Sequence, residues 1–319
     1  MSEGKILSRI LAALPPSRAI VGPGDDAAVL AMPDGRVVAT TDTLVHGPDF
    51  RLAWTSGFDL GWKSAVVNLS DVAAMGAAPT ALLVALAMPE QTAMSFIEEF
   101  AAGLRAACDS VAPGCAVEGG DLTVSDTLTV AVTALGSLQG QPPVLRSGAR
   151  VGDVVAVAGT LGAAGRGLAL LFDRFRDAEG VPCAVDLTSL SDAEAADLSA
   201  QLRPEPPVSL GPVAAAAGAT AMMDVSDGLV LDASRMAEAS GVSVSIQSDS
   251  LGLDASSALT GGEDHALLAT FAHGSELPEG FRAIGVVCAR ASSAVLVDGA
   301  AFTGRGGWDP YNDWDATRG

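Results

Sequence analysis

Basic residues are scarce in this chain. Its 319 residues include 18 Lys and Arg against 38 Asp and Glu, which gives a net charge of −20. Lys5 and Lys63 are the only lysines, so a bound phosphate would have to be met by metal ions, arginine side chains and backbone amides. Nucleic acids and anionic membrane surfaces attract basic proteins. The composition therefore predicts no nucleic-acid partner and no membrane partner.

Cysteine is also scarce, and long hydrophobic runs are absent. Cys108, Cys115, Cys183 and Cys288 include no Cys-x-x-Cys pair, which disfavours a structural zinc site and a secreted disulfide framework. No run of eighteen uncharged apolar residues occurs, and the first residues, MSEGKILSRILAALPPS, are too mixed in charge for a signal peptide. No Gly-x-x-x-x-Gly-Lys-Ser/Thr motif occurs, which excludes a P-loop nucleotide site. We expect a soluble cytoplasmic protein.

Apolar residues, by contrast, are abundant. They make up 49% of the chain, enough for two domains with cores of ordinary size. A loop rich in Pro and Gly, residues 139–152, marks the boundary. We therefore predict an N-terminal domain over residues 1–140 and a C-terminal domain over residues 141–319.

The hydrophobic periodicity predicts helices and strands in both halves. Helices are expected over residues 3–14, 58–76, 91–112 and 228–240, with another ending near residue 174; strands are expected over residues 36–45, 80–88, 127–138, 153–158, 219–223, 242–246, 265–271 and 282–287. Residues 176–207 are acidic and contain prolines, which is typical of a surface excursion with room for a short helix. The β-rich first half lacks the regular strand–helix alternation of a doubly wound sheet, so we predict an α/β fold of the α+β type.

Aspartates recur in short segments flanked by glycine or hydroxyl residues. These segments interrupt apolar runs and contain Asp25, Asp26, Asp42, Asp71, Asp121, Asp224 and Asp227. Carboxylates beside apolar strands are costly unless a cation neutralises them. Because basic side chains are few, a hard divalent ion with oxygen ligands is the obvious neutraliser. The sequence therefore predicts metal and phosphate chemistry.

Each motif also has a purely structural interpretation. Gly-Asp segments at residues 24–26, 119–121 and 261–264 are typical of turns, and the glycine-rich run 159–167 fits a strand-to-helix turn better than a dinucleotide loop. The polar stripe of Ser64, Asn68 and Asp71 on one helix face could face solvent or line a polar site. Ser226 or Asp227 could cap the following helix, a place that also favours phosphate.

Taken together and in order, seven segments resemble thiamine-monophosphate kinase, a family in the superfamily that includes aminoimidazole ribonucleotide synthetase. The matching segments are GPGDDAAVL (22–30), TTDTLV (40–45), NLSDVAAMGA (68–77), GGDL (119–122), LRSGARVGD (145–153), MDVSDGL (223–229) and GGEDHALL (261–268). The resemblance implies a two-domain synthetase-like fold and the phosphorylation of thiamine monophosphate by ATP, through direct in-line transfer with several Mg²⁺ ions. It also implies a homodimer joined through the sheets of the N-terminal halves, with each active site between the two halves of a chain.

The resemblance also assigns roles to individual residues. The positions that match metal ligands are Asp26, Thr40, Thr41, Asp42, Asp71, Asp121, Asp224 and Asp227. Those that match ATP contacts are Gly120, Asp121, Arg146 and Ser226, and those that match substrate contacts are Asp49, Glu263 and Trp308. Two departures occur. By register Asp49, and not His46, takes the place of a histidine found in many relatives, and the ending GGWDPYNDWD differs from the commoner Trp-x-His.

Two other classes of function compete with this interpretation. The first is another enzyme of the superfamily, such as a selenophosphate or aminoimidazole ribonucleotide synthetase. The selenophosphate enzymes usually have a reactive Cys or selenocysteine near the N-terminus, whereas no cysteine precedes Cys108 here. The second is a non-catalytic protein that keeps the fold. Such a protein would be expected to lose several of the metal aspartates, and all of them are present.

Overall fold

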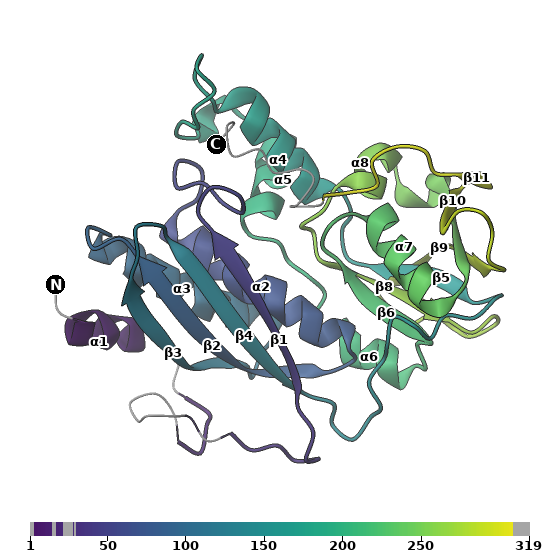
Figure 1. Ribbon diagram of the computed structural model, residues 1–319, viewed down its shortest axis with the longest axis horizontal. Coiled ribbons are helices and arrows are strands. Elements are labelled where there is room, and N and C mark those ends of the chain that lie inside the picture. The colour runs from purple at the N-terminus through teal and green to yellow at the C-terminus, as the bar shows by residue number, and fades with distance from the viewer. Residues whose placement is uncertain (1–2, 15–16, 22–27, 29, 309–319) are drawn as a thin grey trace.

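The computed structural model describes residues 3–14, 17–21, 28 and 30–308. Two sheets with their helices lie side by side (Figure 1). The first sheet has four strands in the order β1-β4-β2-β3, in which β2 and β3 are parallel and the other neighbours are antiparallel. Its strands are β1 (Val38–Val45), β2 (Ala78–Met88), β3 (Ala116–Val124) and β4 (Thr129–Ser137).

Helices cover one face of this sheet (Figure 1). They are α2 (Gly57–Ala74) and α3 (Met94–Val111), with α1 (Glu3–Ala13) packed against α3. Glycines allow α2 and α3 to approach closely. A Cβ at Gly61 would lie 2.0 Å from the backbone oxygen of Phe100, and a Cβ at Gly103 would lie 2.1 Å from that of Phe58. This close packing buries α2 along almost its whole length and fixes the position of the polar side chains that it carries.

The opposite face of the sheet carries no helix of the described chain (Figure 1). Side chains alternate along the strands, so every second residue points to this open face. The face is lined by small, apolar and hydroxyl side chains: Thr41, Thr43, Leu83, Ala85, Ala87, Ala131, Thr133 and Leu135. Strands β1 and β3 are the two edges of the sheet within the described residues. A partly apolar face with two open edges is a surface that proteins usually cover.

The second sheet has seven strands in the order β11-β10-β7-β9-β5-β8-β6. They are β5 (Val154–Ala158), β6 (Ala221–Val225), β7 (Ser243–Ile246), β8 (Ala266–Phe271), β9 (Phe281–Cys288), β10 (Val295–Val297) and β11 (Ala300–Ala301). The helices of this half are α4 (Ala163–Arg174), α5 (Asp192–Leu202), α6 (Leu210–Ala216), α7 (Leu229–Ser240) and α8 (Ala255–Thr260). Figure 1 shows α4 and α5 together above the junction between the sheets.

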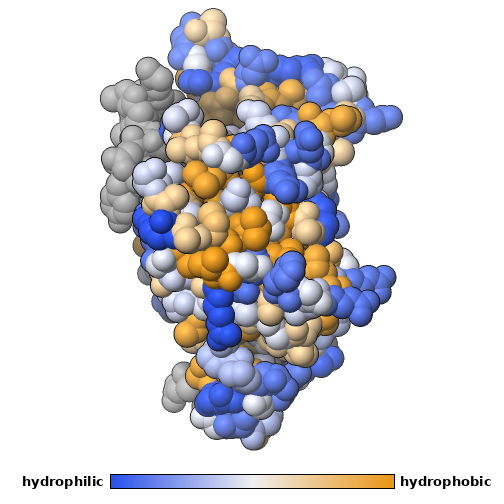
Figure 2. All heavy atoms as spheres, turned by 90° about the vertical axis from the view of Figure 1, so that its right-hand side faces the viewer, coloured by the Kyte–Doolittle hydropathy of each residue, from blue (hydrophilic) through white to orange (hydrophobic). Residues whose placement is uncertain are grey.

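The largest hydrophobic core is shared between the two halves. It includes Leu69 of α2 and Val84 of β2 together with Met222 of β6 and Phe271 of β8. A second core lies within the C-terminal half, between the seven-stranded sheet and α7. The outer face of that half shows hydrophobic residues across its middle, flanked by polar ones (Figure 2). Because both halves bury side chains in one core, packing fixes how the two sheets lie relative to one another.

The predicted mixed α/β class is confirmed. Most predicted elements are present within a few residues of their expected ends. The sequence patterns do not predict β3, β10, β11, α6 or α8. The expected boundary near residue 140 falls between β4 and β5, and the division into two domains there stays a prediction.

Candidate active site

A cavity of about 790 Å³ opens between the two halves. Its walls come from β1 and the segment after it, from helices α2, α4, α5 and α7, and from the loops next to β6 and β8. Residues far apart in the sequence meet here. Of the predicted site residues, the cavity is lined by Asp42, Asp49, Asp71, Asp224, Ser226, Asp227, Glu263 and Trp308.

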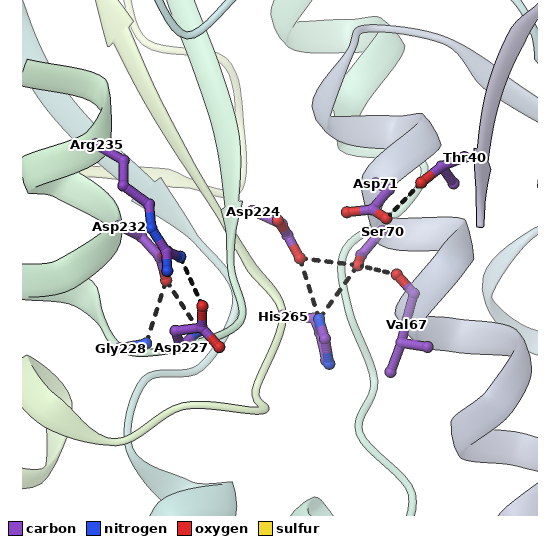
Figure 3. A network of polar contacts seen from close by, with 10 residues as sticks. All are labelled: Thr40, Val67, Ser70, Asp71, Asp224, Asp227, Gly228, Asp232, Arg235 and His265. Carbon is purple, nitrogen blue, oxygen red and sulfur yellow. Dashed lines mark hydrogen bonds and ion pairs between the residues drawn. The ribbon is translucent and has the colours of Figure 1, made fainter. Parts of the chain in front are cut away.

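Carboxylates crowd one end of this cavity. Burial, followed by the negative charges of Asp224 and Asp42, raises the pKa of Asp71 to about 8. Thr40 Oγ1 donates a hydrogen bond to Asp71 Oδ2 at 2.9 Å (Figure 3). The backbone amide of Asp42 donates to Asn68 Oδ1 at 3.0 Å, which ties β1 to α2. Crowding of like charges is unfavourable without a cation, so this end fits a divalent ion with oxygen ligands.

The described part of the chain contains no group of three His, Cys, Asp or Glu side chains drawn closely enough together to hold a metal. The carboxylates are therefore near neighbours and do not form a closed ligand shell. Asp26, which the sequence predicts as a further ligand, lies outside the described residues. The fit to a metal rests on the oxygen chemistry of this end and on the crowding around Asp71.

Asp224 is the next-to-last residue of β6 and faces α2 across the junction of the two halves (Figure 3). Ser70 Oγ donates to Asp224 Oδ2 at 3.1 Å, and His265 Nδ1 lies 3.1 Å from the same oxygen. Burial acts to lower the pKa of His265, but its hydrogen bond to Asp224 and the charge of that carboxylate raise it overall. His265 Nε2 is buried and has no hydrogen-bond partner within the described residues. The three side chains thus tie the acidic end of the cavity to both halves.

The start of α7 is not capped by a side chain in the way that the sequence suggests. Neither Ser226 nor Asp227 caps this helix; the residue before it is Gly228, which provides no side-chain cap. Instead, the Asp232 carboxylate accepts hydrogen bonds from the amides of Asp227 and Gly228, at 3.0 and 3.1 Å. Arg235 Nη1 lies 2.6 Å from both Asp227 Oδ2 and Asp232 Oδ1 (Figure 3). Burial raises the pKa of Asp232 to about 7.

A second polar group, formed by the buried Lys63 and Gln201 and the half-buried Glu263, lies at the other end of the cavity. Lys63 Nζ lies 2.9 Å from Glu263 Oε1 and donates to the backbone oxygen of Gln201 at 3.2 Å. Gln201 Nε2 donates a short hydrogen bond to Glu263 Oε2. Burial alone would raise the pKa of Glu263, but the charge of Lys63 and the two hydrogen bonds hold it below its usual value. Glu263 is therefore an ionised carboxylate held by α2 and α5.

The loop that carries Glu263 is strained. Glu263 and His265 both have positive φ angles, 69° and 54°. A non-glycine residue in this conformation costs about 1–3 kcal/mol, a cost that is usually retained at functional sites. Asp264, between them, accepts hydrogen bonds from the amides of Gly162 and Ala164 at 2.6 and 3.0 Å. Asp264 thus anchors the loop to the start of α4, while its two neighbours line the cavity.

The segment after β1 supplies a further wall. Asp49 lines the cavity and also accepts a hydrogen bond from the amide of Val45 at 2.7 Å, while burial raises the pKa of its carboxyl. The guanidinium carbon of Arg51 lies 5.0 Å from the centre of the Trp54 ring and 4.7 Å from that of Phe172 on α4. Cation–π contacts of this kind join the two halves at the rim of the cavity.

Trp308 is the last described residue and lies at the edge of the cavity. Its amide donates to the backbone oxygen of Asp227 at 2.9 Å. Its side chain is 41% exposed, and the guanidinium carbon of Arg305 lies 5.8 Å from the ring centre. A tryptophan that is held by its backbone and leaves much of its ring exposed is available for contact with a ligand.

Gly120 and Asp121 lie far from this cavity within one chain. The strand register places Asp42 beside Val132, Val132 beside Val84, and Val84 beside Gly120. Three strand spacings separate Asp42 from Gly120, or about 14 Å. The same register puts the exposed side chain of Asp121 on the open face of the sheet. One chain therefore does not bring Asp121 together with the other carboxylates.

Thr41 and Arg146 also point elsewhere. Thr41 Oγ1 lies on the opposite face of β1 from Thr40 and donates to the backbone oxygen of Val132 at 3.0 Å. Arg146 is exposed in the loop between the two sheets, where its backbone oxygen accepts a hydrogen bond from Ser240 Oγ at 3.0 Å. Neither residue lines the cavity.

The structure adds site residues that the sequence analysis does not predict: Lys63, Gln201, Asp232, Arg235 and His265. A signal existed for one of them. Lys63 is the single cation of its helix and lies eight residues, or about two turns, before Asp71, which places both side chains near one face of that helix. Gln201 offers no such signal, because its role depends on a contact with a loop 62 residues away.

Known proteins resemble this chain over most of its length. Residues 24–138 match the AIR synthase related protein, N-terminal domain, and residues 150–277 match the corresponding C-terminal domain. The thiamine-monophosphate kinase of Mycobacterium tuberculosis is 38% identical over 316 residues, which covers 94% of this chain and 88% of that protein.

Solved structures agree. The thiamine-monophosphate kinase of Stenotrophomonas maltophilia has a TM-score of 0.77 at 35% identity and covers 94% of this chain and 96% of its own. AaThiL, solved in complex with AMPPCP and TMP, has a TM-score of 0.74 at 32% identity and covers 95% of this chain and 94% of its own. The fold, the site and these matches agree, and the chain belongs to the thiamine-monophosphate kinase family.

Proposed function

We propose that this protein transfers the γ-phosphoryl group of ATP to the phosphate of thiamine monophosphate, with ADP and thiamine diphosphate as products. The observation that carries the proposal is one cavity with the crowded carboxylates of Asp42, Asp71 and Asp224 at one end and the fixed carboxylate of Glu263 at the other. Such a site can hold a phosphate through metal ions and a cationic organic ring through carboxylates. The activity named for its relatives, and the ATP analogue and TMP bound to AaThiL, support the same reaction.

Several Mg²⁺ ions belong to this proposal. They would be held by Asp42, Asp71 and Asp224, by Asp26, Thr40 and Asp227, and by Thr41 and Asp121 of the open sheet face where a second copy of the chain brings these to the site; there they would neutralise the phosphates and orient the transferred group. The oxygen-only character of these side chains suits magnesium. The raised pKa of Asp71 supports this assignment, because a nearby cation would relieve the repulsion that causes it.

The chain's own residues would bind and align the two substrates. No side chain has to act as the nucleophile, because an oxygen of the thiamine phosphate attacks the γ-phosphorus and the bond to the β-phosphate oxygen breaks in line. Ser226 and Asp227 lie just before α7, where the positive end of the helix dipole favours phosphate. Arg235, 2.6 Å from Asp227, supplies a cation at the same place. Glu263, Asp49 and Trp308 would hold the thiamine rings.

A homodimer is the second part of the proposal. The open face of the four-stranded sheet is partly apolar, and β1 and β3 are its edges within the described residues. Two copies that pack these faces together would cover them and could place β3 of one copy beside β1 of the other. Gly120 and Asp121 of one chain would then complete the ATP site of its partner. Because ATP is an intracellular co-substrate, a cytoplasmic location belongs to the same proposal.

The reaction can be tested by ADP release with thiamine monophosphate, thiamine and hydroxymethylpyrimidine phosphate, each with and without Mg²⁺. Formylglycinamidine ribonucleotide serves as the substrate of the competing synthetase function. We expect release only with thiamine monophosphate and Mg²⁺ together. Full activity in excess chelator would contradict the metal assignment, and turnover of the ribonucleotide alone would favour the synthetase.

The shared site can be tested by mixing two inactive variants, Asp71→Asn and Asp121→Asn. If Asp121 acts in the partner's site, each mixed dimer contains one site with both aspartates intact, and an equal mixture regains about a quarter of wild-type activity when half of the dimers are mixed. If Asp121 acts in the site of its own chain, both sites of a mixed dimer stay defective. The absence of any recovery after subunit exchange would therefore refute the shared site.

A further inference from the structure

The cavity runs along helix α2. Lys63, Val67 and Asp71 line it at intervals of four residues, on one face of the helix. Eight residues of α-helix span about 12 Å, so the crowded carboxylates and the Lys63 group lie about this far apart along the helix. An extended thiamine monophosphate has its phosphate at one end and its aminopyrimidine ring at the other. If the proposed function holds, the phosphate lies near Asp71 and the pyrimidine ring near Lys63.

The ion pair between Lys63 and Glu263 determines which hydrogen bonds this end of the cavity can form. An ionised Glu263 can only accept hydrogen bonds, so the amide group of Gln201 must turn its Nε2 toward that carboxylate. This leaves Gln201 Oε1 as an acceptor, and it is buried without a hydrogen-bond partner within the described residues. An unpaired buried acceptor costs about 1–3 kcal/mol. The ionised Glu263 carboxylate, which lines the cavity and is a third exposed, therefore offers a ligand hydrogen-bond acceptors only.

The group is also firmly held. Lys63 belongs to α2, Gln201 to α5 and Glu263 to the strained loop before β8. Helix α5 is fixed against α4 by Arg166, whose Nε and Nη2 lie 2.9 and 2.7 Å from the carboxylate of Asp197. The acidic segment over residues 176–207 thus includes the helix α5 that positions Gln201 at the Lys63 end of the cavity.

We propose that Lys63 and Gln201 determine specificity by positioning Glu263 to accept a hydrogen bond from the exocyclic amino group of the thiamine pyrimidine. Gln201 keeps its Nε2 on Glu263 Oε2, and the remaining lone pairs of that carboxylate accept from the amino group. An analogue with a carbonyl oxygen in place of the amino group would place a hydrogen-bond acceptor against the carboxylate oxygens of Glu263, which are also acceptors. Sites built to pair with a donor reject ligands that lack it far more strongly than apolar pockets do.

The test compares kcat/KM for thiamine monophosphate with kcat/KM for the monophosphate of the analogue in which a carbonyl oxygen replaces the amino group. In the wild type we expect the amino substrate to be preferred by at least about a hundredfold. Gln201→Met and Lys63→Met should each reduce this preference to about tenfold or less, through a higher KM for thiamine monophosphate and with KM for ATP unchanged. Gln141→Met, at an exposed position outside the cavity, is the matched control and should keep the wild-type preference.

The outcomes separate this inference from the proposed function. A wild type that phosphorylates both substrates equally well would overturn the inference and leave the kinase function intact, whereas no turnover of thiamine monophosphate would overturn the function itself. Folding of each variant is checked by its thermal unfolding. If Lys63→Met does not fold, Gln201→Met decides alone, and an unchanged preference in that folded variant overturns the inference.

Discussion

The crowding around Asp71 predicts a conflict between stability and activity that one substitution can reveal. The pKa of Asp71 rises from 3.8 to about 8, first through burial and then through the charges of Asp224 and Asp42. In the unfolded chain this carboxyl loses its proton near its ordinary pKa. The metal-free folded protein should therefore lose stability progressively between about pH 4 and pH 8, since the unfolded state ionises first.

Asp71→Asn removes this titration and keeps the shape of the side chain. Each pKa unit corresponds to about 1.4 kcal/mol, so the wild type should lose at most roughly 4 kcal/mol from this group between pH 5 and pH 8.5. Relaxation of the neighbouring carboxylates reduces the effect, and we expect the variant in chelator to gain about 1–3 kcal/mol over wild type at pH 8.5 and little at pH 5. With Mg²⁺ present, its turnover should fall at least about a hundredfold, as for removal of a metal ligand.

Urea unfolding in chelator at the two pH values measures the first effect, and ADP release measures the second. Asp173→Asn is the matched control, because Asp173 is exposed on α4 and lies outside the cavity. It should change neither quantity. Equal destabilisation of Asp71→Asn at both pH values would refute the crowding argument, and wild-type turnover would remove Asp71 from the metal site.

Three further predictions concern the substrates and the dimer. Trp308→Ala should raise KM for thiamine monophosphate several-fold to about thirtyfold and leave KM for ATP unchanged, because a cation–π contact with the thiazolium contributes about 0.5–2 kcal/mol; unchanged constants would exclude the ring from the site. Arg146→Lys should raise KM for ATP, because a fork of donors becomes a point charge; a lower melting temperature without that change would indicate a structural role. Ala85→Arg, on the open face of the sheet, should shift the sedimenting species from a dimer toward the 31.9 kDa monomer, and a wild type that already sediments as a monomer would contradict the dimer.

Much of the cavity could be predicted from the sequence, because its carboxylates lie in short motifs. Asp42, Asp71 and Asp224 each follow or interrupt an apolar run, and the structure brings all three to one end of the cavity. The polar stripe of α2 shows the limit of this reasoning. Ser64 and Asn68 do not face solvent; both are buried, and Asn68 holds the backbone of Asp42. Periodicity identifies the stripe, but only packing decides what covers it.

Strand β3 shows why other parts could not be predicted. Its glycines suggest a turn, because glycine has a low preference for strands. The structure explains Gly120 by a contact from another strand, since a Cβ there would lie 2.0 Å from the backbone oxygen of Val84. Gln201 is a similar case, because its function depends on a hydrogen bond to Glu263 from a distant loop. Both features depend on long-range contacts that no local pattern records.

The placement of Asp121 leads to a broader conclusion about this site. The resemblance assigns Asp121 to the metal and ATP site, but in one chain it points away from the cavity, on the open face of an edge strand. Both observations hold together if the open face is an interface and the missing ligand comes from a second copy. The same interface would cover the small and apolar side chains around Ala85 and Ala131. Dimer formation and completion of the ATP site would then be a single event, so substitutions that separate the two copies should abolish activity even where every cavity residue is intact.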